Sequence, residues 1–156
     1  MKILIVIDSM GSGGAQRILV NLIEGLRKSE KKITLLVFNS KSQYFLTPRL
    51  KDSVELIEMK RKSNGFGLSV LLLLIKLYRS ERFSVLSFQP NANIYCILAR
   101  FFKWKTLVYC SEFSVSNKWE PKFRRLVANM CLMFSSGVFC NSETQKQYLQ
   151  RIYGLR

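Results

Sequence analysis

The 156-residue sequence contains no histidine, which excludes every site that depends on an imidazole. Histidine-ligated zinc centres, Ser-His-Asp triads and histidine proton shuttles are therefore ruled out. Acidic residues are also scarce, since 10 Asp and Glu stand against 25 Lys and Arg and the formal net charge is +15. This excess of positive charge favours anionic partners such as phosphate groups or an anionic membrane surface.

Cysteine is sparse and follows no familiar functional spacing. The sequence has no Cys-x-x-Cys pair, and each cysteine lies in an apolar stretch, where a free thiol behaves as a small buried hydrophobe. We therefore expect free thiols and a reducing compartment. The four residues are Cys96, Cys110, Cys131 and Cys140.

Long hydrophobic runs are missing as well. The most apolar run, residues 68–75, is interrupted by Lys76, whereas a membrane-spanning helix needs about 18 apolar residues. The run at residues 3–7 ends at Asp8 and is shorter than the roughly 7 to 15 residues of a secretory signal core. We expect a cytoplasmic protein.

The apolar residues that are present alternate between two patterns. Short continuous aliphatic runs are typical of parallel strands buried on both faces, and segments with 3.6-residue spacing are typical of amphipathic helices. The predicted strands cover residues 3–7, 33–38, 54–57, 84–88, 106–110 and 138–140. The predicted helices cover residues 15–26, 68–78, 94–102, 121–134 and 143–154.

This alternation predicts the α/β class. We expect a Rossmann-like, doubly wound, mostly parallel sheet with helices on both faces, in a single domain over residues 1–156. Ligands of such sheets bind outside the carboxyl ends of the strands.

Local signals mark the ends of the last two helices. Pro121 suits a first helical turn, Ser142 and Gln145 match a capping box, and Gly154 is expected to end the chain's last helix. The helix after Pro121 is expected to bury one apolar face. That face comprises Phe123, Leu126, Val127, Met130, Cys131 and Phe134.

A glycine-rich loop follows the first strand at residues 11–14. Glycines let a backbone approach a ligand closely, and the next helix offers unpaired N–H groups to a phosphate. The dinucleotide fingerprint is absent, because Gln16 occupies its third glycine position and the second strand ends at Asn39 without the ribose-binding acid. No P-loop lysine pattern is present either. A tight turn without a ligand remains the alternative.

Several short segments together resemble the N-terminal domain of family 4 retaining glycosyltransferases, which have the GT-B fold. The first loop of that family commonly reads Gly-Gly-Ala-Glu-Arg. The segments cover essentially the whole chain in the order and spacing of that domain. They are residues 2–7, residues 13–17, residues 20–22, residues 87–90 with Asn93, Ser111 with Glu112, and residues 141–143.

The resemblance implies half of a two-domain enzyme. In that family the N-terminal domain holds the acceptor, and a C-terminal domain with an E-x7-E motif holds most of the nucleotide-sugar donor. This sequence ends at Arg156, about where the family enters its second domain. We therefore expect the acceptor-side half of a transferase for surface polysaccharide or glycolipid synthesis, acting on a sugar or lipid-linked acceptor, with no metal and no cofactor apart from the donor substrate. Little or no transfer activity is expected from this chain alone.

Two alternatives remain open at this point. The chain could be a non-catalytic partner of a separate donor-binding chain, or an inactive remnant. A basic nucleic-acid-binding protein is less favoured, because no helix-turn-helix, KH, OB or RNA-reading strand signature accompanies the charge.

The resemblance also assigns roles to individual residues. Glu112 becomes the candidate catalytic residue, because a carboxylate at the carboxyl end of a strand can hydrogen-bond an acceptor hydroxyl. Local pairing of Glu112 is the alternative, and a solvated position is the alternative for Arg17. The candidate substrate-binding residues are Gly13, Gly14, Arg17, Asn93 and Ser111.

Two positions depart from the family pattern. Gln16 replaces the usual glutamate, and Phe113 stands where many relatives have arginine after Ser-Glu. Both departures bear on acceptor specificity.

Basic residues gather in clusters, and some of these clusters carry aromatic residues, such as Trp104 within residues 100–105. Basic patches that bear Trp and Phe suit an anionic lipid surface. The alternative is that the net charge serves only to keep the protein soluble. We expect membrane docking at the inner face of the plasma membrane. The expected docking residues are Trp119, Lys122, Phe123, Arg124 and Arg125.

Overall fold

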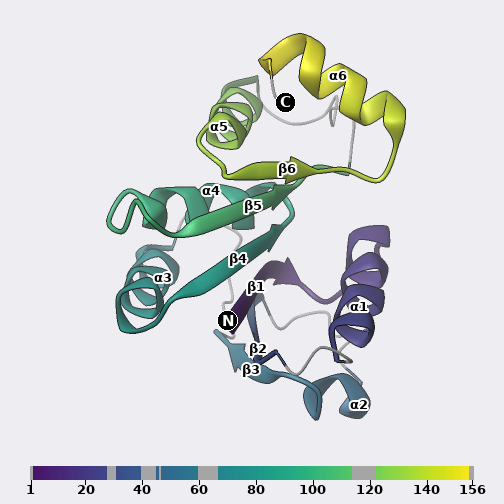
Figure 1. The fold of residues 1–156 in the computed structure, drawn as a ribbon, viewed down its shortest axis with the longest axis vertical. Coiled ribbons are helices and arrows are strands. Elements are labelled where there is room, and N and C mark those ends of the chain that lie inside the picture. Colours follow the sequence, from purple (N-terminus) through teal and green to yellow (C-terminus); the bar gives the residue numbers. More distant parts are fainter. Residues whose placement is uncertain are drawn as a thin grey trace.

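A computed structural model describes residues 2–27, 31–39, 45, 47–59, 67–113 and 122–154. Its centre is a six-stranded sheet in the order β3-β2-β1-β4-β5-β6 (Figure 1). Every pairing between neighbouring strands is parallel. The strands are β1 (Lys2–Ser9), β2 (Ile33–Asn39), β3 (Glu55–Glu58), β4 (Phe83–Phe88), β5 (Leu107–Ser111) and β6 (Gly137–Phe139).

A helix follows each strand, which confirms the predicted α/β class and doubly wound sheet. Parallel strands need such crossover connections, because a tight hairpin cannot join them. The helices are α1 (Gly14–Leu26), α2 (Pro48–Lys51), α3 (Leu68–Ser80), α4 (Pro90–Arg100), α5 (Lys122–Met133) and α6 (Glu143–Tyr153).

Alternate residues of β1 pack in two separate hydrophobic clusters. Leu4 and Val6 pack in one cluster with residues of α3 and α4. Ile3, Ile5 and Ile7 pack in the other, with residues of α1 and α2. Helices therefore cover both faces of the sheet (Figure 1), and this is why the strand sequence is aliphatic without a polar alternation.

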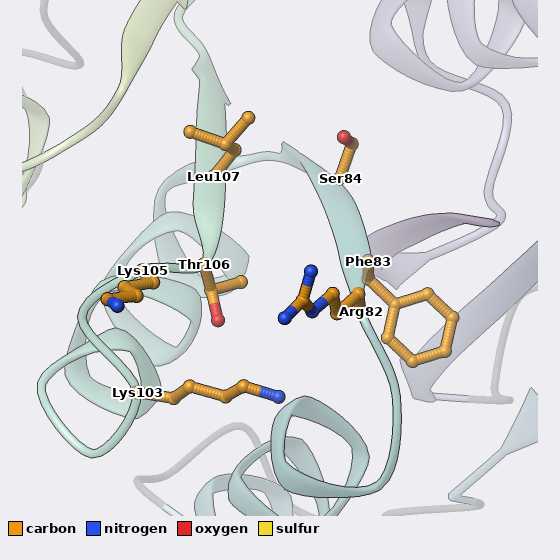
Figure 2. A pocket seen from close by; sticks show the side chains of 7 residues that line it. All are labelled: Arg82, Phe83, Ser84, Lys103, Lys105, Thr106 and Leu107. Atoms are coloured by element: carbon orange, nitrogen blue, oxygen red, sulfur yellow. The ribbon is translucent and has the colours of Figure 1, made fainter. Parts of the chain in front are cut away.

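A ligand could bind at either end of the parallel strands, at the carboxyl edge of the sheet or at its amino edge. The strand order reverses at β1, because the chain leads from β1 to β2 on one side and later to β4 on the other. Such a reversal leaves a crevice outside the carboxyl ends of the strands. At the opposite edge, the amino ends of β4 and β5 border a cavity of about 530 Å³ (Figure 2).

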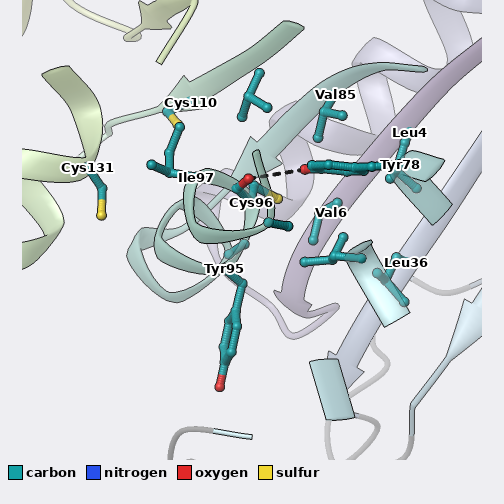
Figure 3. Close-up of a cluster of buried hydrophobic side chains, with 14 of the residues drawn as sticks. Leu4, Val6, Leu36, Tyr78, Val85, Tyr95, Cys96, Ile97, Cys110 and Cys131 are labelled. Atoms are coloured by element: carbon teal, nitrogen blue, oxygen red, sulfur yellow. Dashed lines mark hydrogen bonds between the residues drawn. The ribbon is translucent and has the colours of Figure 1, made fainter. Parts of the chain in front are cut away.

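Buried thiols and Tyr78 lie within the first cluster (Figure 3). The Tyr78 hydroxyl donates to the Cys96 carbonyl at 3.3 Å. Burial raises the pKa of Tyr78, Cys96 and Cys110, that of Cys110 to about 12. Cys96, Cys110, Cys131 and Cys140 are all free, as the sequence predicted.

Two helix starts differ from the sequence prediction. Helix α4 begins at Pro90 rather than at residue 94, because a proline that ends a strand can also be the first residue of a helix. Helix α2 was not predicted at all. Thr47 caps it by accepting a hydrogen bond from the Leu50 N–H at 3.3 Å, and Pro48 occupies its first turn.

The apolar face predicted for α5 is partly wrong. Leu126, Met130 and Phe134 are 57%, 50% and 43% exposed, whereas Leu132 is buried. Pro121 and the Phe123 side chain lie outside the described residues.

The predicted ends of α6 are correct. The Ser142 hydroxyl accepts from the Gln145 N–H at 3.2 Å. Gly154 ends the helix with a φ of 60°, a left-handed conformation that favours glycine.

Candidate functional site

A cleft of about 160 Å³ opens at the carboxyl edge of the sheet. It lies between the start of α1, the β4–α4 turn and the carboxyl end of β5, where the doubly wound fold was expected to bind its ligand. Two predicted site residues, Ser111 and Glu112, line it. The full lining is Ala15, Gln89, Pro90, Ser111, Glu112 and Phe113.

The glycine loop leads into α1 beside this cleft. Gly13 is the N-cap residue of α1, with an extended backbone, and no side chain caps the helix there. The first turn of α1 carries no acidic residue. Backbone N–H groups at an uncapped helix N-terminus attract anions, so the loop can face a phosphate or a sugar hydroxyl.

Gln16 closes the glycine loop onto β1. Its side-chain amide donates to the Ser9 carbonyl at 3.1 Å, and the side chain is 5% exposed. A β-carbon on Gly13 would lie 2.5 Å from Gln16 Oε1, so glycine is the residue that fits there. A glutamate carboxylate could not donate to the Ser9 carbonyl, and the departure from the family pattern therefore has a local structural role.

Gln89 connects the ends of three strands. Its side-chain oxygen accepts from the Asp8 N–H at 3.2 Å, and its own N–H donates to Ser111 Oγ at 3.4 Å. Its φ of 79° is positive, which costs a residue with a side chain about 1 to 3 kcal/mol. Backbone strain of this kind gathers at functional sites. Gln89 was not predicted as a site residue, because glutamine is not one of the residues that favour positive φ.

A second hydrogen bond joins the end of β1 to the start of α4. Asn91, in the first turn of α4, donates its side-chain amide to Asp8 Oδ2 at 2.9 Å. The contact between β1 and α4 holds the two sides of the strand-order reversal together.

Asn93 is buried behind the cleft residue Ser111 and holds its backbone. Its side chain is 1% exposed, and its oxygen accepts from Ser87 Oγ at 2.6 Å while its nitrogen donates to the Ser111 carbonyl at 2.8 Å. The structure places Asn93 next to the predicted site residue Ser111 but with both ends of its amide engaged inside the protein. It fixes the backbone of Ser111.

Glu112 and Phe113 form the far wall of the cleft. The Glu112 N–H donates to the Phe139 carbonyl at 3.0 Å, so the residue continues the pairing of β5 with β6. The Phe113 ring packs on Phe88 and Phe139, with ring centroids 6.0 and 5.8 Å apart. Phe113 therefore gives the cleft an apolar wall.

The remaining predicted residues lie elsewhere. Arg17 is exposed on α1, two residues after Ala15 of the cleft lining. Trp119 lies outside the described residues, and the backbone of Lys122, Phe123, Arg124 and Arg125 forms the first turn of α5, whereas their side chains are not described. Among the described residues no group of three or more His, Cys, Asp or Glu could hold a metal ion.

Comparison with protein families identifies a match over most of the chain. Residues 12–156 match the family described as Glycosyltransferase Family 4. A relative from Campylobacter jejuni, GalNAc-α-(1→4)-GalNAc-α-(1→3)-diNAcBac-PP-undecaprenol α-1,4-N-acetyl-D-galactosaminyltransferase, is 26% identical over 161 residues. The match covers 97% of this chain and 43% of the relative.

Solved structures share the fold at low identity. The Anabaena protein HepE, solved in complex with UDP and glucose, matches with a TM-score of 0.70 at 15% identity, over 97% of this chain and 41% of HepE. The UDP-GlcNAc 2-epimerase of Methanocaldococcus jannaschii matches with a TM-score of 0.62 at 17% identity, over 97% of this chain and 42% of the epimerase. The chain thus spans less than half the length of the proteins it matches.

Proposed function

The chain belongs to glycosyltransferase family 4, and we propose that it provides the acceptor-binding half of an enzyme that transfers a sugar from a nucleotide-sugar to an acceptor hydroxyl. The observation that carries the proposal is the cleft at the strand-order reversal, which Ser111 and Glu112 line. The Campylobacter relative is named for an acceptor linked through a diphosphate to undecaprenol. We propose a lipid-linked saccharide as acceptor here too, in surface polysaccharide or glycolipid synthesis.

The lining supplies the groups that such an acceptor requires. The carboxylate of Glu112 would accept a hydrogen bond from the reacting hydroxyl and orient it. The first turn of α1, with Gly13 and Gly14, would offer N–H groups to a sugar hydroxyl or phosphate. Phe113 and Pro90 would pack against the apolar face of a sugar ring.

The donor would be held by a second Rossmann-like unit. This part of the proposal is supported by the 43% of the Campylobacter relative that the match covers. The second unit would carry the paired glutamates of the family and most nucleotide contacts. The same coverage favours the second candidate function, a non-catalytic partner that supplies the acceptor site to a separate donor-binding chain. In both cases the chain alone would transfer little or no sugar.

Membrane association is part of the proposal. Within the described residues, no helix is both long and apolar enough to cross a bilayer. A lipid-linked acceptor nevertheless requires the protein to work at a membrane surface. The basic and aromatic residues Trp119, Lys122, Phe123, Arg124 and Arg125 are one proposed point of contact with anionic lipid.

Binding of an acceptor analogue tests the proposal. We propose a titration of the chain with an oligosaccharide linked through a diphosphate to a short prenyl group. Glu112→Gln should weaken binding by about tenfold, because the neutral amide oxygen that replaces the carboxylate accepts a weaker hydrogen bond from the hydroxyl. Glu24→Gln is the matched control, since Glu24 is an exposed α1 residue in a long ion pair of 3.8 Å with Arg49. Equal affinities of Glu112→Gln and Glu24→Gln would remove Glu112 from the site.

A further inference from the structure

The cavity at the amino edge of the sheet is separate from the carboxyl-edge cleft and larger than it. Its volume of about 530 Å³ falls within the range of about 300–1,000 Å³ that small-molecule sites usually have, whereas the cleft measures about 160 Å³. No residue lines both. The cavity lies at the amino ends of β4 and β5, and it therefore offers a second place where a small molecule could bind.

The lining of this cavity is basic. Three of its seven lining residues, Arg82, Lys103 and Lys105, are cationic, and none of the seven is acidic. None of the ion pairs found among the described residues involves Arg82 or Lys105. Glu81, which precedes Arg82 in the chain, pairs its carboxylate with Lys2 at 2.6 Å and does not line the cavity. The cavity therefore attracts an anion.

Three hydrogen-bond donors are directed into the same space. Figure 2 shows the Arg82 guanidinium and the Thr106 hydroxyl directed into the space beside the Lys103 ammonium group. Thr106 is 7% exposed, so its hydroxyl is held in the wall of the cavity. Lys103 is held as well, because its ammonium group donates to the Tyr78 carbonyl and, at 3.3 Å, to the Glu81 carbonyl. An ammonium group has three N–H donors, and one of them remains for a ligand.

The two strands extend the lining along the sheet. Ser84 of β4 and Leu107 of β5 are register partners, so their side chains lie side by side on one face of the sheet. Both line the cavity, and Leu107 is 47% exposed. A ligand can therefore place an anionic group among the cations and cover Leu107 with an organic body.

We propose that the amino-edge cavity binds a small soluble organic phosphate. The three terminal oxygens of a phosphate group would accept from the planar fork of Arg82, from the Lys103 ammonium group and from the Thr106 hydroxyl at once, whereas a carboxylate has only two oxygens. A phosphate ion alone would leave most of the 530 Å³ to water. The organic body of the ligand would fill this space and lie over Ser84 and Leu107.

This site goes beyond the proposed transfer reaction and does not depend on it. Strand β4 has six residues, so its two ends lie about 16 Å apart at about 3.3 Å per residue. A ligand at the amino edge and an acceptor in the carboxyl-edge cleft would therefore occupy different positions. Binding at each site can be measured without the other ligand.

A titration followed by nuclear magnetic resonance of the isotope-labelled chain tests the site. Adenosine monophosphate is the probe, because it joins a phosphate to a flat apolar body. The amide signals of Ser84 and Leu107 should move and saturate, while those of Gly13 and Glu112 stay in place. Adenosine, which lacks the phosphate, should cause no saturable shift. Inorganic phosphate, which lacks the body, should bind more weakly by about tenfold or more, and added salt should weaken both phosphates.

Two pairs of variants locate the phosphate contacts. Arg82→Gln should weaken the binding of adenosine monophosphate by about tenfold, because a charge-assisted contact is lost. Arg79→Gln is the matched control, since it makes the same change of charge at an exposed α3 residue outside the lining, and it should keep the affinity within about twofold. Thr106→Val should also weaken binding, whereas Thr106→Ser keeps the hydroxyl and should restore it. Circular dichroism checks that each variant is folded.

Several results would overturn the proposal. Arg79→Gln could weaken binding as much as Arg82→Gln, which would leave only an effect of net charge. Inorganic phosphate could bind as tightly as adenosine monophosphate, which would make the cavity a site for simple anions. The probe could move only the Gly13 and Glu112 signals, or none.

A lipid phosphate is the remaining source of the same chemistry. Vesicles that contain phosphatidylglycerol could change the Ser84 and Leu107 signals while neither soluble phosphate does, and this result would also contradict a soluble ligand. None of these assays contains a saccharide acceptor. Their failure would therefore leave the proposed carboxyl-edge site untouched, and failure of acceptor binding would leave the amino-edge site untouched.

Discussion

The side-chain amide of Asn91 lies 2.9 Å from Asp8 Oδ2, and this hydrogen bond joins the first turn of α4 to the end of β1. The backbone N–H of Asp8 donates to the side chain of Gln89, two residues before Asn91. Asp8 is thus held twice at the point where the strand order reverses. These two hydrogen bonds fix the end of β1 beside the cleft, and a wall that the protein itself holds in place lowers the entropic cost of binding.

Gln89 combines a strained backbone with a side chain that binds the Asp8 N–H, and two substitutions separate these effects. Gln89→Ala keeps the positive φ and loses the contact with the Asp8 N–H, whereas Gln89→Gly loses the same contact but relieves the strain. We expect Gln89→Gly to be more stable than Gln89→Ala by about 1 kcal/mol. Urea unfolding measures the difference, and equal stabilities of the two variants would contradict the strain at this residue.

The two glycines of the loop should respond differently to alanine. In Gly13→Ala the new β-carbon would meet Gln16 Oε1 at 2.5 Å and push that buried side chain away from the Ser9 carbonyl. We expect a loss of about 1 kcal/mol in the free energy of unfolding. Gly14 has open space around its Cα and begins α1, so Gly14→Ala should be neutral or stabilising by up to about 1 kcal/mol. The opposite order would show that the loop is not closed by Gln16.

Asn93 should matter through Ser111 rather than through ligand contact. Asn93→Ala removes the amide that accepts from the Ser87 hydroxyl and donates to the Ser111 carbonyl. The Ser87 hydroxyl can still donate to the Tyr109 carbonyl at 3.4 Å, whereas the Ser111 carbonyl loses a buried donor. The expected cost is about 2 kcal/mol of stability. Asn21→Ala, on the exposed side of α1, is the control and should cost less than about 0.5 kcal/mol. Urea unfolding curves of Asn93→Ala and Asn21→Ala measure these two costs. A stable Asn93→Ala variant with weakened acceptor binding would instead make Asn93 a direct ligand contact.

Most of the fold was predictable, because a parallel strand buried on both sides leaves a continuous aliphatic run in the sequence. All six strands were found within one or two residues of their observed ends, and Ser142 and Gly154 marked the ends of α6. The exposed face of α5 was not predictable. Periodicity shows that a helix has an apolar face, but it does not show how much of that face the rest of the chain covers.

The candidate site was predictable only in outline. The glycine loop and the Ser111-Glu112 pair indicated the end of the strands at which the 160 Å³ cleft lies. Gln89 had no signal, since its positive φ arises from the contacts that hold it at three strand ends. The cavity at the amino ends of β4 and β5 could not be predicted from the basic cluster at residues 100–105, because it depends on how these two strands lie side by side.

Alkaline pH should destabilise the protein through its buried thiols. Burial raises the pKa of Cys110 from 9.0 to about 12, so the unfolded chain releases this proton before the folded chain does. The contribution of Cys110 to stability is therefore complete below pH 9 and declines between pH 9 and about 12. The decline approaches about 1.4 kcal/mol per pH unit for one such group. Cys110→Ala should flatten the pH dependence of the free energy of unfolding in this window, and an unchanged slope would contradict the burial of this thiol.

The central claim is that the carboxyl-edge cleft binds a saccharide acceptor. Nuclear magnetic resonance of the isotope-labelled chain, titrated with the prenyl-diphosphate-linked oligosaccharide, tests it most directly. We predict that the amide signals of Gly13, Gly14, Ser111 and Glu112 move together and saturate, while that of Lys51 on α2 stays in place. Saturating shifts confined to residues away from this cleft, or no shifts at any acceptor concentration, would contradict the account.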